Sequence, residues 1–392
     1  MSTEGTHQQE AERKCPSGET AKPRAMAPVE TAVALPTGLL DDLRSLIEDA
    51  RGRVAAAVNV ETVMLNWHLG QRIWREILGG ARAGYGKRIV DALSRQLIAE
   101  YGRGFGRDNL FHMVRFARTY PEEETVDALS RQLSWTHLRT LMYVGDPLER
   151  EFYTEICRVE RWNTRALKDK IGTMLYQRSA LSKKPEKAIK QELARLRVED
   201  RMTPDMVFRD PVVLRQLGLA ESYSEKELEG AILREIQAFL QEMGTDFAFL
   251  TRQKQMVIDG EDHWLDLLFY HRRLRCLFGI ELKIGRFKAG YKGQMELYLR
   301  WLEENEAREG EAPPLGLILC AGKSSEQIRL LQLDRGRIRV AEYMTELPPR
   351  EVLEDRLHRA IEAARERLAA EEPRVLPNPT AFPKEAMEKD DE

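Results

Sequence analysis

Residues 264–283 decide the fold of the C-terminal half of this chain, and their sequence is WLDLLFYHRRLRCLFGIELK. Apolar residues dominate 264–270 and 276–283, which predicts two β-strands. The basic segment between them, 271–275, is short enough to close a hairpin. The two strands are therefore expected to lie side by side and antiparallel.

Three charged side chains interrupt these strands. Because side chains alternate along a strand, Glu281 and Lys283 point to the same face of the sheet. On the first strand, the face opposite to that of Asp266 is expected to hold Leu265, Leu267 and Phe269. The hairpin then brings Asp266 next to Glu281. Charges in such apolar strands carry a desolvation cost that pairing or a bound metal usually relieves. The alternative is a solvated sheet edge with a simple Glu/Lys pair.

The spacing of these charges resembles the motif of the PD-(D/E)xK nuclease superfamily. Asp266 precedes Glu281-Leu282-Lys283 by 281 − 266 = 15 residues, and Leu265 stands at the proline position of the motif. The resemblance implies phosphodiester hydrolysis, with a metal ion held by Asp266, Glu281 and the backbone carbonyl of Leu282. It also implies that Lys283 positions a water or contacts the scissile phosphate. Since Mg²⁺ prefers oxygen ligands, Mg²⁺ or Mn²⁺ is the expected cofactor.

Neighbouring segments extend the resemblance. Residues 224–227 resemble a capping box that opens a helix, and we expect this helix to run to about Met243. In the superfamily a glutamate of the first helix often faces the metal site, and Glu229 is the matching residue, with a solvated surface glutamate as the alternative. Gln294 and Tyr298 lie four apart on one face of a later predicted helix. They resemble the Gln-xxx-Tyr helix of some superfamily branches, which implies that they belong to the site.

The order of predicted elements matches the superfamily core. Strands at 315–320 and 339–343 complete the order helix, strand, strand, strand, helix, strand. Residues 247–320 resemble the C-terminal domain of the bacterial YhcG-type nuclease-domain proteins, and phrases at 101–106 and 132–137 resemble the helical domain that precedes it in them. The resemblance implies an α+β protein in which a helical N-terminal domain is followed by a restriction-endonuclease-like α/β domain, with a mixed sheet flanked by helices.

Residues 39–200 are predicted to be almost entirely helical, because apolar residues recur at spacings of three and four. This spacing recurs in Leu43, Leu46 and Ile47; in Val63, Trp67 and Ile73; in Val90, Leu93 and Leu97; and in Leu110, Met113, Val114 and Ala117. A glycine-rich turn at 102–106 precedes a helix predicted from Asn109. This arrangement is typical of a helix-turn-helix-like DNA reader, with Arg107, Arg115 and Arg118 near phosphates. A helical scaffold or dimerisation surface is the alternative.

Local charge favours a polyanionic substrate, whereas the charge of the whole chain does not. The chain has 61 basic and 64 acidic residues, so it has no net field that would steer an anion. Around the site, residues 271–292 contain one acid, Glu281, and seven bases, which are Arg272, Arg273, Arg275, Lys283, Arg286, Lys288 and Lys292. Apart from Lys283, these bases are expected to bind nucleic-acid phosphates without reading sequence. An ordinary solvated face is the alternative for each.

Length and composition set the domain organisation. The 392 residues, of which 42% are hydrophobic, are enough for two domains with sizeable cores. We expect a disordered leader at 1–38, a helical domain at 39–200, a linker at 201–223, a nuclease domain at 224–345, and an acidic helix with a disordered tail at 346–392. No stretch approaches the ~20 apolar residues that span a bilayer. The four cysteines show no close metal-ligand spacing, so a cytoplasmic protein without membrane contact is expected.

These features together predict a metal-dependent DNA nuclease of bacterial genome maintenance or mobile-element defence. RNA stays open as a substrate, and a homo-oligomer formed through the helical domain is a further expectation. Two other classes stay in view: a nucleic-acid-binding protein that keeps the fold without catalysis, and a helical assembly protein. The presence of Asp266, Glu281 and Lys283 together argues against a loss of catalysis.

Overall fold

The structure is a computed structural model, and it describes residues 39–78, 83–214, 222–333, 336–346 and 348–371. The expected leader at 1–38 and the tail beyond 371 lie outside these ranges. Contacts divide the chain into a first unit that ends at Ala55 and a second unit that begins at Ala56. The second unit contains both the helical region and the sheet, and all sites described below belong to it.

The N-terminal half of the chain is helical, as the apolar periodicity predicts. Its α-helices are α1 (Leu39–Ile73), α2 (Ala83–Tyr101), α3 (Arg107–Thr119), α4 (Glu123–Ser130), α5 (Trp135–Leu141), α6 (Pro147–Glu160), α7 (Thr164–Gly172), α8 (Leu175–Arg178) and α9 (Glu186–Glu199). Short helical turns occur at η1 (Trp74–Leu78), η2 (Arg103–Phe105) and η3 (Leu181–Lys183). In the part of the chain described, no helix is long and apolar enough to cross a membrane.

Most of these apolar residues are buried or half-buried, with one exception at the start of α1. Val63, Trp67, Leu110 and Met113 are buried within the helical region. In contrast, Leu43, Leu46 and Ile47 are 47%, 65% and 51% exposed. Helical spacing places apolar residues on one face, but burial also requires another element to cover that face.

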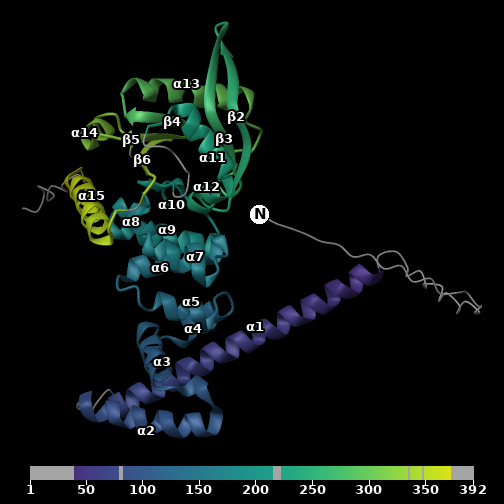
Figure 1. The fold of residues 1–392 in the computed structure, drawn as a ribbon, viewed down its shortest axis with the longest axis vertical. Helices are drawn as coiled ribbons and strands as arrows, with labels where there is room; N and C mark the ends of the chain where they lie inside the picture. The colour runs from purple at the N-terminus through teal and green to yellow at the C-terminus, as the bar shows by residue number, and fades with distance from the viewer. Residues whose placement is uncertain (1–38, 79–82, 215–221, 334–335, 347, 372–392) are drawn as a thin grey trace, which may run out of the picture. The chain divides into compact units, whose positions relative to one another are not determined.

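The C-terminal half forms a six-stranded mixed sheet in the order β1-β6-β5-β4-β3-β2. Its strands are β1 (Val212–Val213), β2 (Phe247–Ile258), β3 (Glu261–His271), β4 (Cys276–Arg286), β5 (Leu315–Gly322) and β6 (Ile338–Met344). β2, β3 and β4 pair antiparallel, and β4, β5, β6 and β1 pair parallel. Figure 1 shows β2 and β3 as a long two-stranded ribbon that extends past the other strands.

Helices accompany the sheet as the superfamily order predicts. They are α10 (Pro204–Val207), α11 (Glu225–Arg234), α12 (Ile236–Met243), α13 (Gly290–Asn305), α14 (Ser325–Leu330) and α15 (Arg350–Glu371). The capping box at Ser224 and Glu227 is present and starts α11. The single helix expected to reach Met243 is instead two helices, which meet at Glu235, where φ is −105° and ψ is 32°.

The sheet is covered on both faces. Leu267 and Phe269 pack in one buried cluster with residues of α11 and α12, whereas Leu268 and Ile318 pack in a second cluster with residues of α13. Gly316 lets α13 approach β5 closely, since a Cβ atom there would lie 2.7 Å from Sδ of Met295. This two-sided burial explains why the central strands are apolar on both faces.

The helical region and the sheet region share buried contacts. Arg178 at the end of α8 is fully buried and pairs with Glu242 of α12, and the Lys170 ammonium donates a 2.6 Å hydrogen bond to the carbonyl of Gln241. The segment 201–223, expected as a linker, contains α10 and β1. Val212 and Val213 of β1 pair with Tyr343 and Met344 of β6, so the sheet begins inside that segment.

Candidate active site

Asp266 and Glu281 lie where β3 and β4 separate. The last paired residues of these strands are Leu267 and Ile280, and one further step of the register sets Asp266 opposite Glu281. The Oδ2 atom of Asp266 accepts a 2.7 Å hydrogen bond from the backbone N–H of Leu282. The carboxylate therefore bridges to β4 beyond the last backbone pair of the ladder, which fixes its position.

The packing of Leu265 corrects one expectation about this strand. Leu265 lies in the buried cluster with α13, whereas Leu267 and Phe269 lie in the cluster with α11 and α12, so the three do not share a face. Regular alternation does not persist here, because β3 leaves β4 at this point. A Cβ atom on Gly279 would lie 3.0 Å from Cδ2 of Leu265, so this glycine leaves room for the leucine side chain.

Glu281 is buried, with 4% of its surface exposed. Its Oε1 atom accepts hydrogen bonds from Nζ of Lys283 at 2.9 Å and from Nε2 of Gln294 at 3.1 Å. Among the residues described, no hydrogen-bond partner reaches its buried Oε2 atom. A buried carboxylate oxygen without a donor is costly, and a cation is one group that would satisfy it.

Gln294 and Tyr298 lie at this carboxylate, on the face of α13 that their spacing predicts. The Nε2 group of Gln294 also donates a 2.7 Å hydrogen bond to the Tyr298 hydroxyl oxygen. Tyr298 is buried, and it holds the amide that contacts Glu281. The structure therefore brings together Asp266, Glu281, Lys283, Gln294 and Tyr298.

Burial and like charge shift the titration of both acids. Burial first, and the nearby Asp266 carboxylate second, raise the pKa of Glu281 to about 7. Burial also raises the pKa of Asp266 from its ordinary value. For Lys283, burial alone would lower the pKa, but the Glu281 carboxylate outweighs it and the pKa is raised. Lys283 is therefore a cation at neutral pH, with the Tyr291 ring 5.3 Å from its Nζ atom.

Glu229 and Gln253 form a second layer beside Asp266. The Nε2 atom of Gln253 donates hydrogen bonds to Oε2 of Glu229 at 2.8 Å and to Oδ1 of Asp266 at 3.0 Å. Glu229 is buried on α11, as the resemblance implies for a residue that faces the site, and its contact with Asp266 runs through the Gln253 amide. Gln253 lies in β2 with a φ of 46°, and the sequence pattern alone does not place it at the site.

The only signal for Gln253 was its place opposite Asp266 across the β2–β3 hairpin. The flanking pairs Arg252 with Leu267 and Lys254 with Leu265 set this register. The pairing of Gln253 with Asp266 follows from the sequence only when the position of the turn at Asp259 and Gly260 is known, because the turn sets the register of the hairpin.

The donor set fits a hard divalent cation. Asp266 and Glu281 supply carboxylate oxygens, and Glu281 has a buried oxygen available. Within the described ranges, no group of three or more His, Cys, Asp or Glu side chains is placed to hold a metal. Such a sparse set suits Mg²⁺, which usually keeps several waters and takes one or two carboxylates.

The basic residues predicted to contact phosphate lie in two places. Arg286 and Lys288 are exposed just beyond Lys283, and Lys292 pairs with Glu296 at 3.3 Å. Arg272, Arg273 and Arg275 lie at the β3–β4 turn. This turn begins after His271, five residues from Asp266 along β3, or about 17 Å at ~3.3 Å per residue. Arg273 is paired there with Asp246 at 2.9 Å and with Asp200. The structure therefore does not bring the turn arginines to the site.

The three arginines of α3 each have a partner. Nε of Arg107 lies 2.5 Å from Oδ1 of Asp91. Nε of Arg115 donates a 3.2 Å hydrogen bond to the carbonyl of Met142, and its guanidinium lies 4.1 Å from the centre of the Tyr143 ring. The Arg118 guanidinium lies 4.2 Å from the centre of the Trp74 ring. The helix begins at Arg107, two residues before the predicted Asn109.

Two family models match the chain. The model of the DUF1016 N-terminal domain matches residues 42–178, and the model of the YhcG PDDEXK nuclease domain matches residues 205–358. A protein of Escherichia coli (strain K12) named "Putative nuclease YhcG" is 32% identical over 352 residues, which make up 81% of this chain and 92% of that protein.

Two solved structures are similar to one third of the chain. The crystal structure of a repair endonuclease from Pyrococcus abyssi is 22% identical and matches 33% of this chain and 50% of its own, with a TM-score of 0.23. The structure of EndoMS in apo form is 21% identical and matches 33% of this chain and 49% of its own, also with a TM-score of 0.23. The match thus spans about half the length of each of these structures.

Proposed function

The chain belongs to the YhcG family, and from that premise we propose that it is a metal-dependent DNA endonuclease whose active site is formed by Asp266, Glu281 and Lys283. One observation carries the proposal. Two carboxylates from adjacent strands meet where the strands separate, a lysine cation is bonded to one of them, and the buried Oε2 atom of that carboxylate has no partner among the residues described. A sheet edge with a simple ion pair would leave its carboxylate in water instead.

Asp266, Glu281 and the carbonyl of Leu282 would hold the cation, which we take to be Mg²⁺ or Mn²⁺. When bound, such a cation supplies Lewis-acid stabilisation of the negative charge that develops on the phosphate oxygens. Burial raises the pKa of both acids, and the Asp266 carboxylate raises that of Glu281 further, so a cation would favour the ionised form of both.

Lys283 acts as a hydrogen-bond donor in this proposal. Because its pKa is raised, the ammonium stays protonated at neutral pH and cannot take a proton from the attacking water. Its Nζ atom donates a 2.9 Å hydrogen bond to Glu281, and the Glu225 carboxylate lies 3.6 Å away. Lys283 would orient the water or contact the scissile phosphate.

Gln253, Glu229, Gln294 and Tyr298 act as positioning residues. The Gln253 amide holds the Asp266 and Glu229 carboxylates in fixed orientations, and the Gln294 amide does the same for Oε1 of Glu281. Groups that orient metal ligands usually matter nearly as much as the ligands themselves. Arg286 and Lys288, which are exposed next to the site, are the best placed phosphate contacts.

The choice of DNA as substrate, and of genome maintenance or mobile-element defence as the setting, belongs to the same proposal. Its test is cleavage of supercoiled, linear, branched and single-stranded DNA, with an RNA strand in parallel, in the presence of Mg²⁺, Mn²⁺ or EDTA. Cleavage of a DNA substrate that needs the cation supports the proposal. Binding without cleavage under every condition would favour a nucleic-acid-binding role. The absence of both binding and cleavage would favour a role as a helical assembly protein.

A further inference from the structure

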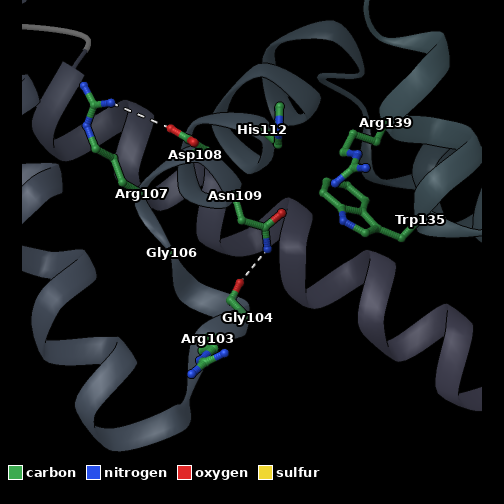
Figure 2. Close-up of a pocket in the computed structure, with 9 residues that line it drawn as sticks. All are labelled: Arg103, Gly104, Gly106, Arg107, Asp108, Asn109, His112, Trp135 and Arg139. Atoms are coloured by element: carbon green, nitrogen blue, oxygen red, sulfur yellow. Dashed lines mark hydrogen bonds and ion pairs between the residues drawn. The ribbon is translucent and has the colours of Figure 1, made fainter.

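An open pocket of about 750 Å³ lies in the helical region, and none of its lining residues belongs to the candidate active site. Figure 2 shows Trp135 and Arg139, from α5, on one side of it, and Arg103 and Gly104, from η2, on the other. The first turn of α3 contributes Arg107, Asp108 and Asn109. The volume is in the usual range for ligand pockets, about 300–1,000 Å³.

The charge of this pocket is positive. Three arginines line it, and Asp108 is the one acidic lining residue. Arg107 is paired with Asp91, whereas Arg103 and Arg139 form no ion pair with any other residue that the structure describes. Burial and the positive charge of Arg139 lower the pKa of His112, so this lining histidine is neutral at pH 7. Two guanidinium groups are therefore left for an anionic ligand.

Backbone groups add to this anion site. α3 begins after Gly106, and no side chain caps it, so the N–H groups of its first turn face outward without a side-chain acceptor. The Nδ2 group of Asn109 donates a hydrogen bond to the Gly104 carbonyl and ties the loop to α3. A Cβ atom on Gly104 would meet no atom within 4 Å, so a ligand has access to the main chain there. Helix N-termini with free N–H groups favour phosphate.

Trp135 gives the pocket an aromatic wall. It starts α5, and its ring packs against Phe116 with centroids 5.2 Å apart and an interplanar angle of 83°. The indole is thus held in place from the core side while it lines the open pocket. A fixed aromatic ring beside guanidinium groups is the usual arrangement for holding an unpaired base next to its phosphate.

We infer that this pocket binds one nucleotide of an unpaired DNA strand, with its phosphate at Arg103, Arg139 and the start of α3 and its base stacked on Trp135. A base inside a duplex is stacked on its neighbours and cannot lie against the indole, so the unpaired strand is the ligand that uses the whole pocket. The choice of DNA as the strand rests on the proposed function. That the ligand has a phosphate and a base is inferred from the arginines and the indole that line the pocket. The pocket would give the nuclease a preference for DNA with single-stranded segments.

The test is fluorescence anisotropy in EDTA with a labelled oligothymidylate, an abasic strand of equal length and a duplex. In Arg103→Ala/Arg139→Ala, affinity for the oligothymidylate should fall about tenfold, and the slope of log affinity against log salt should decrease by about 0.7 per lost phosphate contact. The matched control Arg165→Ala/Arg195→Ala removes two exposed arginines of the same region outside the pocket and should stay within about twofold of the parent protein. Equal losses in both double variants, or an unchanged salt slope, would overturn the assignment.

Two further variants test the stacking of the base on Trp135 and the room for the nucleotide beside Gly104. Trp135→Leu should weaken oligothymidylate binding about fivefold or more and leave binding of the abasic strand unchanged. Since Trp135 also packs on Phe116, Gly104→Leu supplies a variant that places a side chain in open space at a backbone position that tolerates one. Gly104→Leu should bind the single strand more weakly while its melting temperature stays unchanged. Full retention of affinity would contradict nucleotide binding in this pocket.

The remaining measurements distinguish the source of the nucleotide. The Arg103→Ala/Arg139→Ala variant should lose less affinity for the duplex than for the single strand. Equal losses for both would contradict binding of an unpaired nucleotide. Free dTMP should bind far more weakly than the strand, and equal affinity would assign the pocket to a free nucleotide instead. Because all binding is measured without metal, these outcomes do not depend on whether the chain cleaves DNA.

Discussion

The side-chain amide of Gln253 donates a 3.0 Å hydrogen bond to Oδ1 of Asp266. The same Nε2 group donates to Glu229 at 2.8 Å, so one amide joins carboxylates from β3 and α11. Neighbouring carboxylates repel each other, and a shared donor reduces this repulsion while it fixes both orientations. In the proposed site, Gln253 would thus orient Asp266 before any cation binds.

Gln253→Ala should therefore weaken Mn²⁺ binding and cleavage by about 10- to 100-fold, the usual effect of losing a group that orients a ligand. Calorimetric titration with Mn²⁺ measures the binding directly. Gln255→Ala is the matched control, because Gln255 lies on the same strand and bonds to the exposed Asp262 instead. A Gln253→Ala protein with parental Mn²⁺ affinity would remove Gln253 from the site.

The metal itself should be held by oxygen ligands. We expect Mg²⁺ and Mn²⁺ to support cleavage and Ca²⁺ to bind while supporting it poorly, because catalysis depends on coordination geometry as well as charge. The Asp266→Asn/Glu281→Gln double variant should lose Mn²⁺ binding in calorimetry. Unchanged Mn²⁺ affinity in this double variant is the result that contradicts the ligand assignment.

The buried acid at the site should make stability depend on pH. The pKa of Glu281 is raised from 4.5 to about 7, mainly by burial and then by Asp266, so the folded state holds the proton more tightly than the unfolded chain. Its contribution to stability is fully present below about pH 4.5 and is lost as pH rises through about 7. Glu281→Gln does not titrate. In EDTA, its free energy of unfolding relative to the parent protein should therefore rise by on the order of 3 kcal/mol between pH 4.5 and 8.

Urea denaturation of both proteins at several pH values measures this difference, and shifts from titrating groups outside the site cancel in the comparison. A difference that stays constant with pH would mean that Glu281 is not the enclosed acid described above.

Glu242 should matter for the stability of both halves of the second unit. It pairs with the fully buried Arg178 and lies 3.4 Å from Lys170, so Glu242→Ala leaves two buried cations without their carboxylate. The expected loss is about 3–5 kcal/mol in the free energy of unfolding. Denaturation followed by circular dichroism measures it, with Gln237→Ala at an exposed position of α12 as the control. A loss no larger than that of the control would contradict a shared core.

The parts of the candidate site that depend on strand alternation, hairpin length and helical repeat could be predicted from the sequence. Adjacency of Asp266 and Glu281 follows from strand alternation and a hairpin of fixed length, and the spacing of Gln294 and Tyr298 follows from the helical repeat. The position of Leu265 was not predictable in this way, because alternation assumes a regular strand and β3 leaves its neighbour there.

Other features could not be predicted, because they depend on which residues distant in the sequence the fold brings together. Arg272, Arg273 and Arg275 are close to Glu281 in sequence, yet a strand carries them to its other end. Gln253 reaches Asp266 only through the register of β2, which its own segment does not encode. The apolar residues at the start of α1 repeat at helical spacing, and such spacing does not say whether another element covers them.

The most direct test of the central claim is cleavage of supercoiled plasmid by the parent protein beside Asp266→Asn, Glu281→Gln and Lys283→Ala, purified identically. The parent protein should convert the plasmid to nicked or linear DNA with Mg²⁺ or Mn²⁺ and leave it intact in EDTA. Each variant should show no cleavage above the EDTA background while it stays folded and its DNA binding stays close to that of the parent. Cleavage by Lys283→Ala at the parental rate, or equal cleavage by the parent in EDTA, would contradict the account.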